Sequence, residues 1–113
     1  MKIIKGPITL SELNDLAQHF FMTMVKAVVD VERAVMAIDA EMHADEEALL
    51  IQNGSKQENL WGINLYPENK GDGFIEFDSM INIKPRQNNR SRSVENSEVR
   101  SKIRDIVNVL VTK

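Results

Sequence analysis

The chain has 113 residues, enough for one hydrophobic core, and we expect a single domain over residues 1–113. Apolar residues make up 42% of it, as in ordinary globular proteins, and the absence of cysteine excludes disulfides, thiolate metal sites and cysteine nucleophiles. The net charge of −3 hides an asymmetry, because residues 1–83 carry a charge of −8 and residues 84–113 a charge of +5.

No apolar run reaches the roughly 20 residues that a membrane-spanning helix needs, and the first residues lack the apolar segment of a signal peptide. Together with the absence of cysteine, these features favour a cytoplasmic protein without a membrane partner. The basic end either docks against the acidic part, within one chain or between subunits, or meets an external anion. We favour docking, because most charge asymmetries in small domains need no ligand.

The N-terminal part predicts a short strand and a helix. Residues 1–5 have the pattern of a strand, closed by a Gly-Pro pair. Thr9 and Glu12 have the spacing of a capping box, and apolar side chains then recur at helical spacing from Leu10 to about Met24. We therefore expect the first helix to span residues 10–24.

The next segments alternate between apolar and polar residues. Residues 25–31 have period two and high β-branched content, which predicts a strand. Residues 33–38 stay apolar with a blurred alternation, as in a strand covered on both faces. Residues 41–48 fit either a strand or a short helix, and this choice stays open.

Two further strands are expected after a hairpin. Asn53-Gly54 is the strongest short hairpin signal, because both residues tolerate the positive φ of a type I′ turn. Residues 60–66 form the return strand, in which Gly62 marks a bulge or a close approach of another backbone. Residues 74–84 alternate again. One side of that strand holds Ile75, Phe77, Ser79, Ile81 and Ile83, and the other holds Glu76, Asp78, Asn82 and Lys84.

The last element is a helix capped by Asn96 or Ser97, with an apolar stripe that runs to Leu110. The element order predicts an α+β fold: an antiparallel four-stranded meander, plus a short N-terminal strand, with two helices packed on one face. The other sheet face is expected to be polar and uncovered. Its expected members are Asp30, Glu32, Asn64, Tyr66, Glu76, Asp78 and Asn82.

A basic loop precedes the last helix and is a candidate anion site. It contains Arg86, Arg90 and Arg92, with Asn88 and Asn89 as neutral donors. Arginine binds phosphate and carboxylate groups bidentately, and the N–H groups of a helix N-terminus favour the same charge. The overall acidity and the lack of stacking aromatics argue against nucleic acid. A small phosphate-bearing ligand or an acidic protein patch fits better.

An acidic cluster offers the alternative chemistry. If the segment is a strand, His43, Asp45 and Glu47 share one face; if it is a helix, His43 and Glu47 do. With acids from the sheet, they could hold a metal. This alternative describes a metal-dependent hydrolase or nuclease. The segment lacks an HExxH pattern, and one histidine is a thin ligand set. The competing interpretation is a solvated acidic edge that pairs with the basic end.

Four runs, MVKAVVDVE, HADEEALL, GSKQENLWGINLYP and IEFDSMINIKP followed by NRSR, resemble a small prokaryotic family of uncharacterised proteins, one of the domains of unknown function. The resemblance spans nearly the whole chain. It implies no activity, cofactor or partner, so it carries over no functional residue.

The function expected from the residues is a small soluble binding or interaction module that uses the polar sheet face and the arginine loop. No motif fixes a reaction, so the sequence does not decide whether the chain is an enzyme, and no cofactor is expected. Self-association into a homo-oligomer is expected from the opposed charge halves. Apolar Val28, Phe74 and Met80 on the uncovered face support it.

Overall fold

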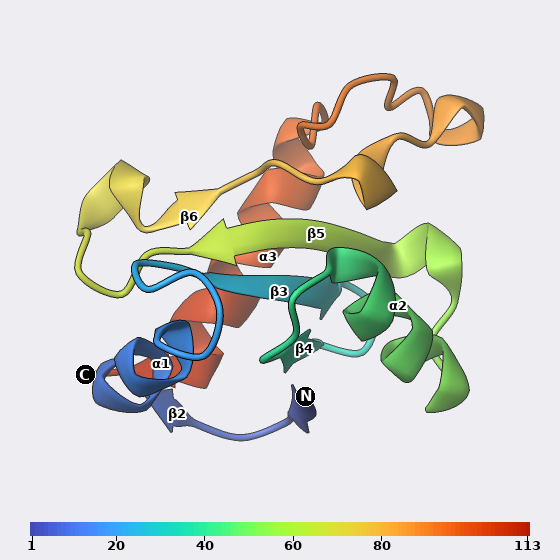
Figure 1. Ribbon diagram of the computed structural model, residues 1–113. Helices are drawn as coiled ribbons and strands as arrows, with labels where there is room; N and C mark the ends of the chain where they lie inside the picture. Colours follow the sequence, from blue (N-terminus) through green and yellow to red (C-terminus); the bar gives the residue numbers. More distant parts are fainter.

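The computed structural model describes residues 1–113 as an α+β fold with three helices and a five-stranded sheet (Figure 1). The sheet order is β1-β4-β3-β5-β6, and every pairing in it is antiparallel. Its strands are β1 (Lys2–Ile4), β3 (Val25–Asp30), β4 (Val35–Ile38), β5 (Leu60–Leu65) and β6 (Ile75–Glu76). The predicted fold class and the antiparallel sheet are confirmed.

A separate parallel pair joins β2 (Ile8–Thr9) to β7 (Val111–Thr112), so the segment before α1 (Leu10–Ala17) pairs with the segment after α3 (Ser97–Leu110). None of the helices is long and apolar enough to cross a membrane.

The strand order differs from the predicted sequential meander. Strand β3 lies between β4 and β5, and β4 does not pair with β5. The physical reason is helix α2 (His43–Gln52), which follows β4 and returns the chain to the other side of β3. The segment whose structure stayed open in the sequence is therefore a helix, and it reroutes the sheet.

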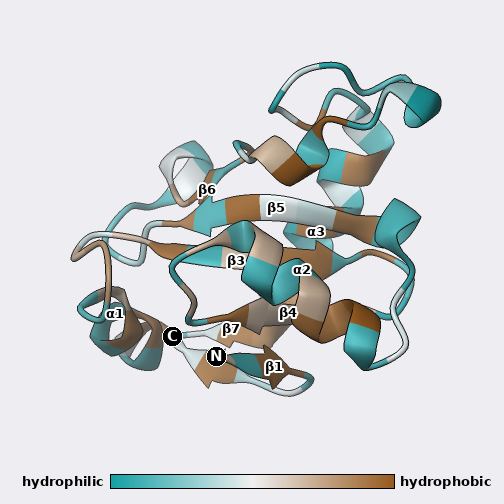
Figure 2. Cartoon of the chain, turned by 45° about the vertical axis from the view of Figure 1, so that its right-hand side comes forward, coloured by the Kyte–Doolittle hydropathy of each residue, from teal (hydrophilic) through white to brown (hydrophobic).

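Helices cover both sheet faces. Helices α1 and α3 (Ser97–Leu110) pack on one face, where their apolar residues join Ala27 and Val29 in the main core. Helix α2 packs on the opposite face against a smaller cluster that includes Val28 and Leu60. Figure 1 shows α3 behind the sheet and α2 in front of it, and Figure 2 shows α2 across β3 and β4. The face predicted to be uncovered is thus partly covered, and Val28 is fully buried.

Helix α1 starts where the sequence predicts and ends early. The Thr9 hydroxyl accepts a hydrogen bond from the Glu12 backbone N–H at 3.0 Å, which forms the predicted cap. The helix ends at Ala17 rather than near Met24, since the chain turns back there: the Met22 N–H donates to the Ala17 carbonyl at 2.8 Å, and Gln18 Nε2 donates to the Met22 carbonyl at 2.9 Å. Met22 then has a φ of +69° and is exposed.

Asn53-Gly54 ends a helix rather than forming a hairpin. Gly54 has a φ of +100°, its N–H donates to the Ile51 carbonyl at 3.1 Å, and the Ser55 N–H donates to the Leu50 carbonyl at 3.0 Å. This pair of bonds is a Schellman motif. The hairpin prediction was wrong because positive φ serves both kinds of turn.

The predicted strand over residues 74–84 pairs with β5 only at Ile75–Glu76. Beyond it, the Asn82 side chain takes the place of a strand: its Oδ1 accepts from the Gly62 N–H at 2.8 Å and its Nδ2 donates to the Gly62 carbonyl at 2.9 Å. Asn82 is therefore buried, and Lys84, whose Nζ donates to the Gln57 carbonyl, is buried as well; neither is outward-facing as predicted.

Gly62 is closely approached, but by the side chains of Ser79 and His43 rather than by another backbone. A Cβ atom at this position would lie 2.5 Å from the Cβ of Ser79, too near for any side chain without movement of the backbone around Ser79.

Candidate functional site

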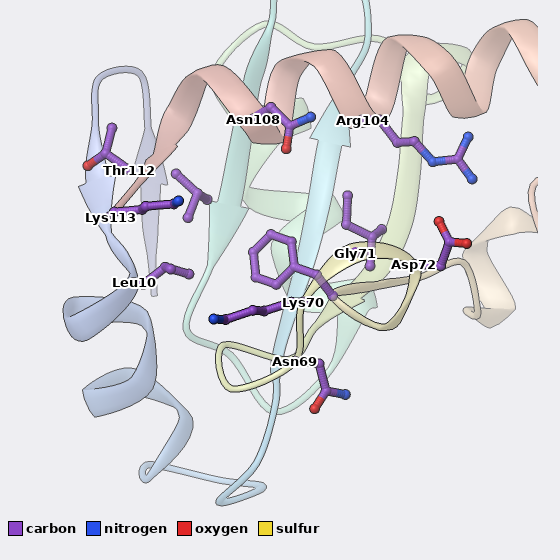
Figure 3. Close-up of a pocket in the computed structure, with 12 residues that line it drawn as sticks. Leu10, Asn69, Lys70, Gly71, Asp72, Arg104, Asn108, Thr112 and Lys113 are labelled. Atoms are coloured by element: carbon purple, nitrogen blue, oxygen red, sulfur yellow. The ribbon is translucent and has the colours of Figure 1, made fainter.

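A groove with a volume of about 800 Å³ lies beside β6, between the loop over residues 69–73 and the C-terminal half of α3 (Figure 3). The loop folds this way because Gly71 has a φ of +61° and its carbonyl accepts from the Phe74 N–H at 3.1 Å. The Tyr66 N–H in turn donates to the Phe74 carbonyl at 2.9 Å. These bonds turn the chain back and set Phe74 at the groove wall.

The lining of this groove combines apolar and basic side chains. The apolar residues are Leu10, Phe74, Ile75 and Val111, and the neutral polar side chains are Asn69, Asn108 and Thr112. The charged residues are Lys70, Arg104, Lys113 and Asp72. Figure 3 shows that Lys70 comes from the loop, Arg104 from α3 and Lys113 from the segment after β7.

The three cations of the groove are unpaired. The salt bridges of the molecule lie elsewhere, at Asp39 and between Arg92 and Asp78. The Arg104 guanidinium is 5.2 Å from the centre of the Phe77 ring, which limits the directions that this side chain can take. The groove therefore presents positive charge around an apolar wall.

The arginine loop is exposed at all three arginines and is held by a buried amide. Asn89 is 3% exposed, and its Nδ2 donates to the Asn82 carbonyl at 2.7 Å and to the Ser93 carbonyl at 2.6 Å. Its Oδ1 accepts from the Glu95 N–H at 2.8 Å. Asn89 thus organises the loop from inside and does not face a ligand, whereas Asn88 is exposed.

Two acidic side chains of the same chain, Glu95 and Asp78, already accept hydrogen bonds from the arginine loop. Glu95 Oε2 accepts from the Arg90 N–H at 3.0 Å, the Ser91 N–H at 2.8 Å and the Ser91 hydroxyl at 2.7 Å. These hydrogen bonds, that of the Ser91 hydroxyl first, lower the pKa of Glu95. Arg92 Nε donates to Asp78 Oδ1 at 2.7 Å, which raises the pKa of Arg92. The guanidinium groups of Arg86 and Arg90 have no ion pair.

The residues of the predicted polar face separate into three places. Asn64, Tyr66, Glu76 and Asp78 form one network, in which Asn64 Nδ2 donates to Glu76 Oε1 at 2.8 Å and Tyr66 Oη donates to the same oxygen at 3.0 Å. Asn64 Nδ2 also lies 3.4 Å from the Asp78 carbonyl. Burial and the Glu76 carboxylate raise the pKa of Tyr66. Asn82 belongs instead to the arginine loop.

Asp30 holds the turn between β3 and β4. Its Oδ1 accepts from the N–H groups of Glu32 and Arg33, both at 2.9 Å, and its Oδ2 accepts from the Ser55 hydroxyl at 2.6 Å. Asp30 is 1% exposed, and Glu32 lies in the turn, exposed. Asp30 therefore has a structural task that joins the turn to the end of α2.

The three residues of the alternative metal site do not form a ligand set. His43 is buried at the first position of α2, where its Nε2 donates to the Ile63 carbonyl at 2.8 Å, and burial lowers its pKa. Asp45 is exposed and Glu47 is partly buried. No three histidine, aspartate or glutamate side chains gather where they could hold a metal ion.

The sequence did not predict the burial of two ionisable residues, Glu46 and Lys84. Glu46 is fully buried, neither carboxyl oxygen has a hydrogen-bond partner, and burial raises its pKa to about 10. Glu46 lies on the same face of α2 as His43 and Leu50, so a helix over this segment would have predicted its burial. Lys84 Nζ donates to the Gln57 carbonyl at 2.8 Å and lies 5.3 Å from the Trp61 ring centre, and burial lowers its pKa.

Comparison with known proteins gives one match. Residues 2–110 match the family model DUF5674, described as a protein of unknown function. No curated protein and no solved structure matches the chain significantly. The match covers all three helices and every strand except β7, and it confirms the resemblance to an uncharacterised family. The chain belongs to DUF5674, a family of proteins of unknown function.

Proposed function

We propose that this protein is a small binding module and that its ligand lies in the groove between α3 and residues 69–75. The observation that supports this most directly is the lining, which combines four apolar residues with three unpaired cations in about 800 Å³. Ligand sites in proteins have volumes of about 300–1,000 Å³ and pair apolar walls with a few placed polar groups.

The same lining favours binding over catalysis. It contains one carboxylate, Asp72, and no histidine, so it lacks a pair of groups that could exchange a proton with a substrate. Its one hydroxyl side chain is that of Thr112, and the lining holds no histidine that could activate it as a nucleophile. The module is thus expected to hold a ligand without converting it.

A blocking substitution tests this proposal. Asn108 lines the groove from α3 and its side chain makes no hydrogen bond within the molecule, so Asn108→Trp should fill the groove without loss of a side-chain hydrogen bond. Val109→Trp is the matched control, since Val109 is 75% exposed on the same helix and does not line the groove. The probe is 8-anilinonaphthalene-1-sulfonate, followed by ¹⁵N–¹H NMR.

We expect the probe to shift amides of residues 69–75 and 104–112 in the wild type and in Val109→Trp, and not in Asn108→Trp. Shifts that gather on another surface, or that survive Asn108→Trp unchanged, would contradict the groove as the ligand site.

We also propose that the arginine loop binds an anion, either a phosphate-like ligand or carboxylates of a second copy. Exposed, unpaired guanidinium groups at Arg86 and Arg90 support this. Self-association is part of the same proposal. Met80 and Ile83, 66% and 42% exposed, supply apolar surface beside the loop. No arrangement of residues favours the metal-dependent hydrolase alternative.

A further inference from the structure

We propose that the groove takes an amphipathic anion, a small molecule with a carboxylate or phosphate head on an aliphatic or aromatic body. This inference rests on the proposed function and names the ligand class of the same site. Two separate properties of the lining lead to it, the balance of charge and the position of the apolar residues.

The charge of the groove opposes that of the whole chain. The side chains of Lys70, Arg104 and Lys113 face one acidic side chain, Asp72, so the side-chain charge of the groove is positive in a chain with a net charge of −3. None of these cations is neutralised by a salt bridge. Cations on separate walls around a low-dielectric surface concentrate the field between them, which favours an anion placed there over one at the open surface.

Among these cations, Arg104 has a partly fixed side chain. The Arg104 guanidinium lies over Phe77, and Lys70 stands beside the turn that Gly71 makes. An arginine held by an aromatic ring loses less side-chain entropy when it binds a carboxylate or phosphate group. The groove is therefore expected to bind such a head with modest reordering.

The apolar residues of the lining indicate that the ligand has an apolar part attached to its anionic head. Phe74, Ile75 and Val111 pack against the main core and remain partly exposed at the groove, and Leu10 adds to them from the start of α1. An inorganic anion would leave this surface in contact with water. An attached apolar chain would cover this surface, and removal of apolar surface from water favours binding.

Four probes separate the two properties by ¹⁵N–¹H NMR titration: octyl phosphate below its micelle concentration, octanoate, inorganic phosphate and 1-octanol. We expect octyl phosphate and octanoate to shift the groove amides. Their affinity should exceed that of inorganic phosphate by about tenfold or more, since two or three buried methylenes suffice for that factor. It should exceed that of octanol severalfold, because the cations of the groove are exposed and an ion pair with an exposed cation contributes less.

Substitution of individual cations tests which of them bind the anionic head of the ligand. Lys70→Gln and Arg104→Gln should each weaken octyl phosphate severalfold and leave octanol unchanged. Arg104→Lys, which keeps the charge, should retain most of the affinity. Lys102→Gln is the control, because Lys102 is exposed on the same helix and does not line the groove. Thermal unfolding of each variant checks that the fold is intact.

The outcomes distinguish this inference from the function on which it rests. Equal affinity for octanol and octyl phosphate would overturn the anionic head and leave the groove as a binding site. Equal affinity for inorganic phosphate and octyl phosphate would overturn the apolar body. Groove amides that respond to none of the four probes would overturn the proposed function itself.

Discussion

Replacement of Glu46 by glutamine should stabilise the protein at neutral pH. The carboxyl group is fully buried without a hydrogen-bond partner, and its pKa rises from 4.5 to about 10 because of burial. The positive charge of Lys26 and the backbone of Ala40 oppose that rise, and the carboxylate of Asp39 adds to it. At pH 7 the side chain is therefore neutral in the native state and ionised in the unfolded chain.

The magnitude follows from linkage. Between the unfolded and the folded pKa the native state binds one more proton than the unfolded state, so stability falls as pH rises through this window. Each pH unit from 4.5 to 7 corresponds to 1.36 kcal/mol, which gives a loss of about 3 kcal/mol at pH 7. Glutamine has the same shape and does not ionise, so Glu46→Gln should recover about this amount as an upper value.

Urea denaturation at several pH values measures the effect. The free energy of unfolding of the wild type and of Glu46→Gln should agree near roughly pH 4 and diverge steadily up to neutral pH. Glu41→Gln is the control, because Glu41 is exposed and close in sequence. A difference that does not change with pH, or a glutamine variant no more stable at pH 7, would show that Glu46 is ionised in the fold and would refute the reasoning.

Further predictions concern the loop beside β5 and the assembly of the protein. Gly62→Ala should destabilise the fold by roughly 1–3 kcal/mol through its clash with Ser79, and Ser79→Gly should relieve most of that loss in the double variant. Asn82→Ala should lower the free energy of unfolding in urea by about 3 kcal/mol, since it leaves both backbone groups of Gly62 unpaired; a loss no larger than that of Asn108→Ala would contradict this role. The double variant Arg90→Ala, Arg92→Ala should weaken phosphate binding or assembly while the thermal midpoint stays nearly unchanged, and an unfolded variant would mean that these arginines are internal braces. Light scattering should detect an oligomer at high protein concentration, and a monomer in both low and high salt would refute self-association.

Local signals in the sequence located the ends of elements where side chain and backbone interact within a few residues. Thr9 caps α1, and Asn96 caps α3 by accepting from the Glu98 N–H at 2.8 Å. Period-two alternation located β3 and β5 because their odd-numbered residues face one core. These features depend on neighbours in sequence, which a single chain displays directly.

Features that depend on distant contacts were not predictable in the same way. Residues 77–84 alternate like a strand, but the Asn82 amide binds Gly62, 20 residues earlier, and draws the chain out of the ladder. Asn53-Gly54 satisfies the same backbone requirement at a helix end as in a hairpin. The groove lining comes from the start of α1, the loop after β5, α3 and β7, and only the fold brings them together.

The amide of Asn82 has a consequence for how these molecules behave toward one another. Strand β6 pairs with β5 only at two positions, so the rest of β5 would present free N–H and C=O groups along the border of the sheet. An open border of this kind is a template on which another chain can add a strand, the first step of aggregation. The Asn82 side chain takes up both backbone groups of Gly62 and thereby closes that border where no strand covers it. Substitution at this position is thus expected to expose the protein to intermolecular strand addition as well as to unfolding.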